Sequence, residues 1–147
     1  MRYTHEEQMR DLTAAIGRLA SGRLCSPTPA QYAIEPALEG SREFQRYFLR
    51  ELKSRRDFCV DRVRNNEGLS CEIPAAAFYL MIKTKKLGGR TDEQFVLDLL
   101  EQTGVLVVNG SGFGVDPEQG YFRLVYLADE STLGDVFDRI DRFMSSA

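Results

Sequence analysis

The sequence predicts an α+β fold, a two-layer domain in which helices pack a small sheet, preceded by long helices. Two patterns in the 147 residues predict it. Before about residue 66 the apolar residues recur at helical spacing, and after it short strand patterns alternate with helix patterns. A helical segment over residues 1–65 and an α+β domain over residues 66–147 are therefore expected. With 43% apolar residues, a chain of this length can bury a core without disulfides.

The first segment should contain three helical stretches. Thr4 and Glu7 fit a capping box that opens the first helix, which should end before Pro27. A short helical stretch over residues 30–38 has a point of interruption at Pro36, and a long helix should cover residues 41–65. The apolar stripe of the first helix comprises Met9, Leu12, Ile16 and Leu19, and that of the long helix Phe44, Phe48, Leu52, Cys59 and Val63.

The second segment opens with strands over residues 69–73 and 77–83. Thr91 and Gln94 fit a capping box at the start of a helix, and Gly104 stands where a helix C-terminal glycine belongs. A fully apolar strand over 105–108 and an alternating strand over 121–127 come next. The last helix should pack against the sheet through Leu133, Val136, Phe137, Ile140, Phe143 and Met144.

Arg123 lies inside an apolar strand pattern, on the face that also carries Tyr121 and Val125. A guanidinium stays charged in proteins, so a partly buried one needs an anion, and its donors match a carboxylate in a bidentate pair. The residues alone favour an internal Asp or Glu partner over a ligand, because buried charges are normally paired within the protein.

Composition argues against several classes of function. A net charge of -3 gives no basic field for nucleic acid, and no stretch approaches the ~20 apolar residues of a membrane span. The three cysteines lack the spacing of a zinc site or disulfide framework, which favours a reducing, cytoplasmic setting and no metal. The only histidine, His5, lies in a capped first turn and should be solvated. Gly110 to Gly114 precede a strand, so a tight turn is favoured over a phosphate-binding loop.

Four stretches in order carry a family resemblance: residues 23–33, 74–79, 105–114 and 120–124. From about Leu19 to its end, the chain resembles the C-terminal part of a pyridoxal-phosphate-dependent class I/II aminotransferase of the aspartate aminotransferase fold. The alanine aminotransferase branch is the most similar. The resemblance implies the small domain of that fold, with residues 1–65 including the linker to a missing large domain. It departs from the family pattern at Ala75 and Ala76, where a glycine is expected, and at Asn109, which replaces a proline.

The resemblance gives Arg123 a specific role, since the matching arginine binds the α-carboxylate of the amino-acid or 2-oxo-acid substrate. By the same resemblance, Phe78 and the 111–114 turn would line or support closure around the substrate, although packing is the favoured account of these residues. The cofactor-binding lysine and most phosphate-binding residues of the family lie upstream of the matched part. We therefore expect pyridoxal phosphate only in the complete enzyme, no catalytic residue in this chain, and no transamination by the chain alone.

Two interpretations remain open. In the first, the chain is the substrate-clamping domain of an aminotransferase acting on an amino acid, alanine by resemblance, with the large domain and a homodimer partner completing it. In the second, it is a standalone, non-enzymatic binding or interaction module derived from that domain. The first predicts exposed apolar surface on the first helix and over residues 27–38, and the second predicts that this surface is covered, for example by dimerisation.

Overall fold

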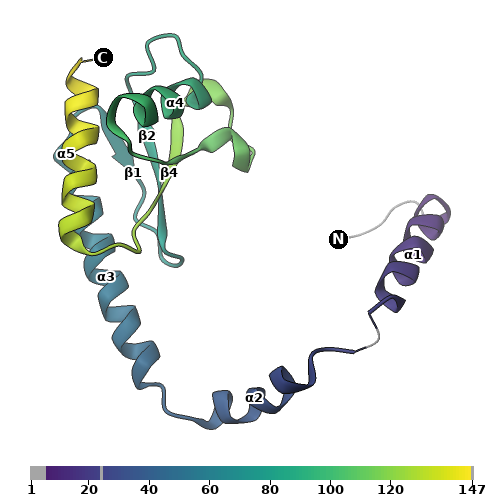
Figure 1. Cartoon of the computed structure of the whole chain (residues 1–147). Helices are drawn as coiled ribbons and strands as arrows, with labels where there is room; N and C mark the ends of the chain where they lie inside the picture. Colours follow the sequence, from purple (N-terminus) through teal and green to yellow (C-terminus); the bar gives the residue numbers. More distant parts are fainter. Residues whose placement is uncertain (1–5, 24, 147) are drawn as a thin grey trace. The chain divides into compact units, whose positions relative to one another are not determined.

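The computed structural model describes residues 6–23 and 25–146 (Figure 1). The chain divides into two compact units, Met1–Arg42 and Glu43–Ala147, which are described separately. The first unit contains two helices, α1 (Glu6–Ser21) and α2 (Thr28–Glu39). The expected capping residue Thr4 lies outside the described residues.

Helix α2 runs through Pro36 without the interruption considered from the sequence. It begins directly after Pro27, with a second proline in its first turn, where the missing amide hydrogen costs nothing. Pro36 removes one amide donor near the C-terminal end of the helix. The next turn nevertheless closes, because the Gly40 amide donates to the Pro36 carbonyl at 2.9 Å.

The second unit is built on an antiparallel four-stranded sheet of order β1-β2-β4-β3. Strands β2 and β4 form its centre, and Met81 of β2 and Val108 of β3 both lie opposite Arg123 of β4. The strands are β1 (Leu69–Cys71), β2 (Tyr79–Thr84), β3 (Val108–Asn109) and β4 (Tyr121–Val125).

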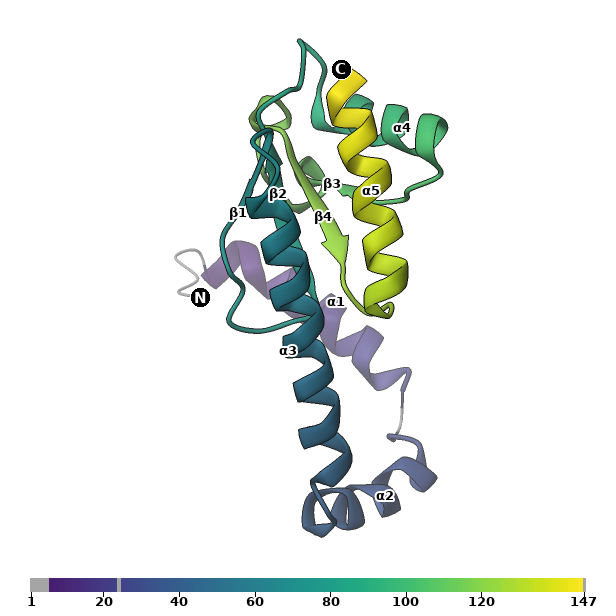
Figure 2. The same cartoon turned by 90° about the vertical axis from the view of Figure 1, so that its left-hand side faces the viewer.

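Three helices cover one face of this sheet, as Figure 2 shows for two of them: α3 (Glu43–Arg64), α4 (Asp92–Thr103) and α5 (Glu130–Ser146). Phe122 lies at the centre of the core between sheet and helices. The Phe95 ring packs 5.7 Å from the Phe122 ring and 5.4 Å from that of Phe143, so α4 and α5 meet over β4. The two-layer α+β fold expected from the sequence is confirmed. The amphipathic face expected for α5 is confirmed as well, because Leu133, Phe137, Ile140, Phe143 and Met144 are buried.

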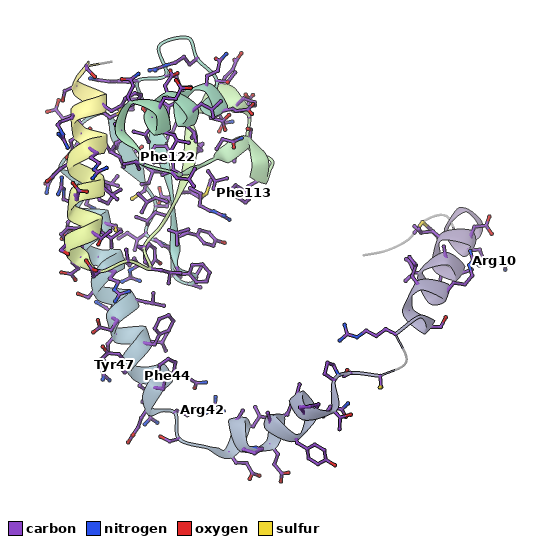
Figure 3. The ribbon with its side chains drawn as sticks, viewed as in Figure 1. Arg10, Arg42, Phe44, Tyr47, Phe113 and Phe122 are labelled. Atoms are coloured by element: carbon purple, nitrogen blue, oxygen red, sulfur yellow. The ribbon has the colours of Figure 1, made fainter. Side chains whose placement is uncertain are left out.

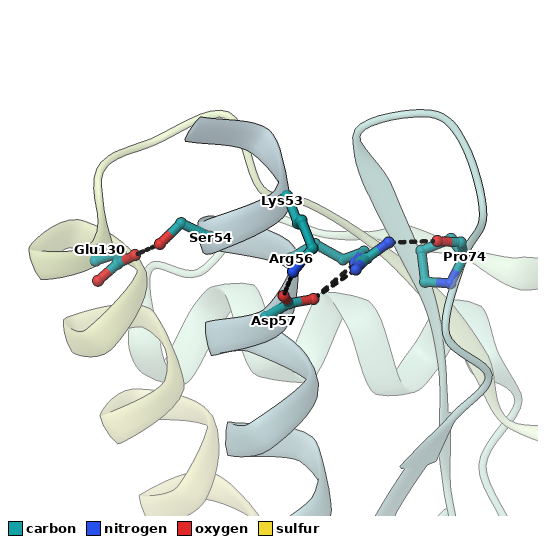
Figure 4. Close-up of polar contacts among 6 residues, drawn as sticks. All are labelled: Lys53, Ser54, Arg56, Asp57, Pro74 and Glu130. Atoms are coloured by element: carbon teal, nitrogen blue, oxygen red, sulfur yellow. Dashed lines mark hydrogen bonds and ion pairs between the residues drawn. The ribbon is translucent and has the colours of Figure 1, made fainter. Parts of the chain in front are cut away.

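Helix α3 belongs to the same compact unit as the sheet. This unit therefore begins at Glu43. Arg56 pairs with Asp57 and donates to the Pro74 carbonyl, while Ser54 donates to Glu130 at the start of α5 (Figure 4). Only the C-terminal part of the expected α3 stripe is buried, because Cys59 and Val63 enter the core while Phe44 and Phe48 remain exposed. Figure 3 shows Phe44 and Tyr47 on the part of α3 that extends away from the sheet.

The capping box of α4 forms as predicted. The Gln94 backbone amide donates to Thr91 Oγ1, and the Thr91 backbone amide donates to the side-chain oxygen Oε1 of Gln94. Gly104 ends the helix in the left-handed conformation, with φ 71°. The strand predicted over residues 105–108 is wrong in extent, since only Val108–Asn109 pair as β3. Val105 and Val107 are buried and Leu106 is exposed, so the segment packs as an extended chain without a strand partner for its first three residues.

Asp129 is the N-cap of α5, and its carboxylate accepts from the Ser131 hydroxyl and the Thr132 amide. The Ser131 hydrogen bond and the Thr132 amide lower the pKa of Asp129 to about 2 from 3.8. A depressed folded-state pKa contributes stability above the unfolded value, and the contribution is lost as pH falls through the folded value. Asp129→Ala should therefore lower the melting temperature at pH 7, and the difference from wild type should shrink between pH 4 and pH 2. Calorimetry at several pH values tests this, and a difference independent of pH would contradict it.

Ala77 adopts the left-handed conformation, with φ 70°, and for this reason β2 begins two residues later than the strand predicted over 77–83. Its carbonyl accepts from the Tyr126 hydroxyl at 3.1 Å, which fixes the bend. A β-branched side chain is strained in this conformation, so Ala77→Val should destabilise the fold by about 1–2 kcal/mol. Urea denaturation measures the change. Ala75→Val, at an exposed neighbouring position without positive φ, is the matched control, and equal effects of the two substitutions would refute the strain.

Candidate functional site

One face of the sheet is left uncovered by the described helices of the second unit. The alternation along β4 sends Phe122 and Leu124 into the helix-covered core and Arg123 to the opposite face. Residues directly opposite each other in antiparallel strands share a face. The surroundings of Arg123 on this open face are therefore largely apolar and aromatic: Tyr79, Met81, Val108, Tyr121 and Val125.

The Arg123 guanidinium packs against two aromatic rings rather than a carboxylate. Its Cζ lies 4.3 Å from the Phe113 ring centroid and 5.1 Å from that of Tyr79. Its Nε is buried and has no hydrogen-bond partner among the described residues. The internal Asp or Glu partner favoured from the residues alone is not found in the described part of the chain. Other basic residues do form ion pairs there, among them Lys53, Arg55, Arg56, Arg62, Arg90 and Arg139.

The glycine-rich segment before β4 forms a tight turn, as predicted, within the 3-10 helix η1 (Gly110–Phe113). The Gly110 backbone lies so close to β4 that a Cβ there would stand 2.6 Å from Tyr121 Cβ. Gly114 closes the turn in the left-handed conformation, with φ 84°. Figure 3 places Phe113 on this turn, beside the sheet, and Phe122 inside the domain. The turn is thus held against the strand that carries Arg123.

Asp92, the first residue of α4, connects that helix to the turn. Its side chain is 1% exposed. It accepts hydrogen bonds from the Ser111 amide at 2.6 Å, the Ser111 hydroxyl at 3.0 Å and the Glu93 amide at 2.8 Å. Sequence reasoning missed this contact, because Asp92 reads as an ordinary acidic residue in the first turn of a capped helix and no pattern links it to a serine 19 residues away.

None of the other residues considered from the sequence has a polar contact with Arg123 in the described part of the chain. His5 lies outside the described residues. The Phe78 ring is partly exposed and meets the Tyr79 ring edge-on at 6.0 Å. Cys59 lies in the core, and burial raises the pKa of its thiol to about 12, so it stays protonated and is no nucleophile. A hollow of about 290 Å³ lies along β1 and β2 on the open face, between Cys71, Tyr79, Met81 and Tyr121. Lys83 lines it as well, whereas Arg123 does not.

Comparison with known proteins places this geometry in a class. The model of the family "Aminotransferase class I and II" matches residues 11–140, so the chain belongs to the class I and II aminotransferases. It is 36% identical over 134 residues to the glutamate-pyruvate aminotransferase AlaA of Haemophilus influenzae, covering 88% of this chain and 33% of that protein. It is 34% identical over 145 residues to the alanine aminotransferase of Mycobacterium bovis, covering 96% and 34%.

A solved structure agrees with this result. The alanine aminotransferase from Pyrococcus furiosus superimposes with a TM-score of 0.82 at 37% identity, covering 97% of this chain and 36% of that chain. The chain thus spans about a third of the length of the curated relatives it matches. No helix within the described residues is both long and apolar enough to cross a membrane.

The lysines of this chain do not fit covalent attachment of pyridoxal phosphate, the cofactor on which this family depends. All four lie in the described part of the chain, and none of them is buried. Burial or a neighbouring cation is what normally activates a lysine amine. Instead, each has a surface partner: Lys53 pairs with Asp57, Lys83 lies over the Tyr121 ring, and Lys85 and Lys86 donate to the carbonyls of Glu67 and Met144.

Proposed function

We propose that this chain is the substrate-clamping part of an aminotransferase, in which Arg123 binds the carboxylate of the substrate. The reaction is transfer of an amino group between an amino acid, alanine by its similarity to alanine aminotransferases, and a 2-oxo acid. The observation that carries the proposal is that the Arg123 guanidinium, with its Nε buried, contacts two aromatic rings and forms no hydrogen bond or ion pair among the described residues. A buried donor left unpaired costs about 1–3 kcal/mol, more when it is charged, and a ligand carboxylate bound to this guanidinium would offset part of that cost.

The environment of Arg123 suits an organic carboxylate. The guanidinium presents a planar fork of donors that can bind both carboxylate oxygens at once. Phe113 and Tyr79 pack against this group and limit its rotation, so the bound carboxylate is held in one direction. A carboxylate fixed in this way orients the neighbouring Cα, which is the atom that must lose a proton during transamination.

The remaining catalytic groups are proposed to come from outside this chain. Pyridoxal phosphate, which serves as the electron sink of the reaction when bound, would be held by residues of a large domain, because the four lysines here do not fit it. A homodimer partner is a second proposed contributor. We also propose a cytoplasmic location, because Cys25, Cys59 and Cys71 are all free thiols.

The first unit supports a missing large domain over a standalone module. No residue of α2 is buried, and both α1 and α2 leave large apolar side chains exposed. These side chains are Leu12, Ile16, Leu19, Tyr32, Ile34 and Leu38. An apolar surface of this kind normally contacts another protein surface. A standalone binding module would cover it by self-association, so light scattering of the purified chain together with binding of a hydrophobic dye separates the two functions.

A chimera tests the proposal directly. Residues 1–147 would replace the matching third of the Pyrococcus furiosus alanine aminotransferase, to which the chain is 37% identical. We expect the chimera to transfer the amino group of alanine to a 2-oxo acid, and the chain alone, supplied with pyridoxal phosphate, to form no oxo acid. A folded, cofactor-loaded chimera without activity would refute the clamping role. Oxo acid formed at an enzymatic rate by the chain alone would refute the need for a large domain.

A further inference from the structure

We infer that Asp92 is a positioning residue for Arg123, acting through Ser111 and the aromatic ring of Phe113. The inference deepens the proposed function and rests on it, since it concerns how the carboxylate-binding arginine is held. Among the described residues, the hydrogen bonds of the Asp92 side chain go to Ser111 and Glu93, and none goes to Arg123. Its influence must pass through the backbone of the turn.

The first step is the link between Asp92 and Ser111. One carboxylate oxygen, Oδ2, accepts from the Ser111 amide, and the other, Oδ1, accepts from the Ser111 hydroxyl and the Glu93 amide. Hydrogen bonds to an ionised carboxylate are about twice as strong as neutral ones. Burial excludes the water that would otherwise compete for these donors. The turn is therefore pinned at Ser111 to the N-terminal end of α4.

The second step is the rigidity of the turn between Ser111 and Phe113. The Asn109 side chain donates to the Ser111 hydroxyl at 2.7 Å, and the Gly114 amide donates to the Ser111 carbonyl at 3.0 Å. Both of these contacts, together with the two donated by Ser111 to Asp92, converge on one residue. Because Phe113 lies two residues later in the same 3-10 helix, fixing Ser111 fixes the direction of the Phe113 side chain.

The third step is the contact between Phe113 and the guanidinium. The Phe113 ring is 48% exposed, so core packing alone does not hold it in place. Its centroid nevertheless lies 4.3 Å from Arg123 Cζ, closer than the Tyr79 ring. If Asp92 stopped holding the turn, this ring would move away and the guanidinium would gain rotational freedom. A carboxylate would then bind an arginine that is less well oriented.

The ligand-free chain gives the first test, by NMR of the Arg123 side chain. The Phe113 ring current should shift the Arg123 Nε–H and Cδ–H resonances, and Phe113→Leu should remove the shift. Asp92→Asn, which keeps the shape but turns one acceptor into a donor, should move these resonances toward the Phe113→Leu values. Asp98→Asn on the same helix, which removes a surface ion pair with Arg90, is the control and should leave them unchanged. Unchanged Arg123 resonances in Asp92→Asn would overturn the inference.

Titration with pyruvate gives the second test. Asp92→Asn should weaken pyruvate binding at Arg123 by about three- to tenfold, the range expected for loss of one cation–π contact. In the Phe113→Leu background the same substitution should have no further effect, because both act through one ring. Additive effects in the double variant would overturn the inference. If Asp92→Asn unfolds the chain, Ser111→Ala, which removes a single hydroxyl, takes its place. The Arg123 resonances and the affinity for pyruvate are then measured in that variant. If the wild-type chain does not bind pyruvate, the proposed function fails, while the ligand-free spectra still decide the role of Asp92.

Discussion

Replacing Arg123 with leucine is expected to abolish pyruvate binding by this chain, with a loss of at least about tenfold in affinity. The estimate follows from removing hydrogen bonds between charged partners, each of which contributes about 1.5–3 kcal/mol. Leucine keeps an apolar side chain on the same face of β4 as the Phe113 and Tyr79 contacts, so the open face of the sheet should stay intact. The substitution removes a buried donor that lacks a partner in the described structure together with two cation–π contacts, so the net change in the stability of the fold should be small.

NMR titration with pyruvate measures this effect. Arg123→Lys keeps the positive charge but loses the planar fork, and we expect it to bind more weakly than wild type. Lys83→Gln is the charge-matched control, because it also removes one positive charge from the same open face, where Lys83 lies over the Tyr121 ring. Equal losses in Lys83→Gln and Arg123→Leu would show that pyruvate responds to net charge, which would contradict a specific carboxylate site.

Replacing Phe122 with alanine is expected to destabilise the fold by about 3–5 kcal/mol, the usual effect of truncating a buried phenylalanine. Phe122 is fully buried on the central strand β4 and stacks on Phe95. Truncation leaves a cavity where β4 meets α4, and a domain of this size is typically stable by only about 5–15 kcal/mol. Urea denaturation measures the loss. Val125→Ala on the same strand, at an exposed position of the opposite face, should cost far less, and comparable losses would contradict the position of the core.

The elements that were predicted correctly have a residue pattern that repeats within the element itself. In α5, apolar residues recur at helical spacing and mark the buried face. In α4, Thr91 and Gly104 mark the N-terminal and C-terminal ends of the helix. The extent of β3 could not be predicted, because it depends on how far β4 offers a partner. The exposed start of α3 could not be predicted either. An apolar stripe such as that of Phe44 and Phe48 shows which side chains a helix could bury. Which of them are buried depends on what the rest of the fold packs against that helix.

In the candidate site, too, residues with a local sequence pattern could be predicted, and contacts between distant residues could not. Arg123 could be recognised because the period of two in its own strand sets one charge among apolar residues. The contacts of Phe113 and Tyr79 with the guanidinium could not be predicted from the residues, since they depend on strand pairing and on the path of the turn. The role of Asp92 in holding the turn could not be predicted from the sequence at all. Its partners are a backbone amide and a hydroxyl far away in the sequence, and such contacts leave no pattern in the residue order.

The shortness of the outer strands governs how copies of this protein can meet. Strand β1 has three residues and β3 has two, so the sheet exposes few free backbone groups at its edges. Short edges disfavour the growth of a sheet from one molecule into the next, the first step toward fibrils. Association of this chain through its sheet edges is therefore disfavoured relative to contacts between side chains. Such contacts depend on matching shapes, and they favour one defined assembly over open-ended aggregation.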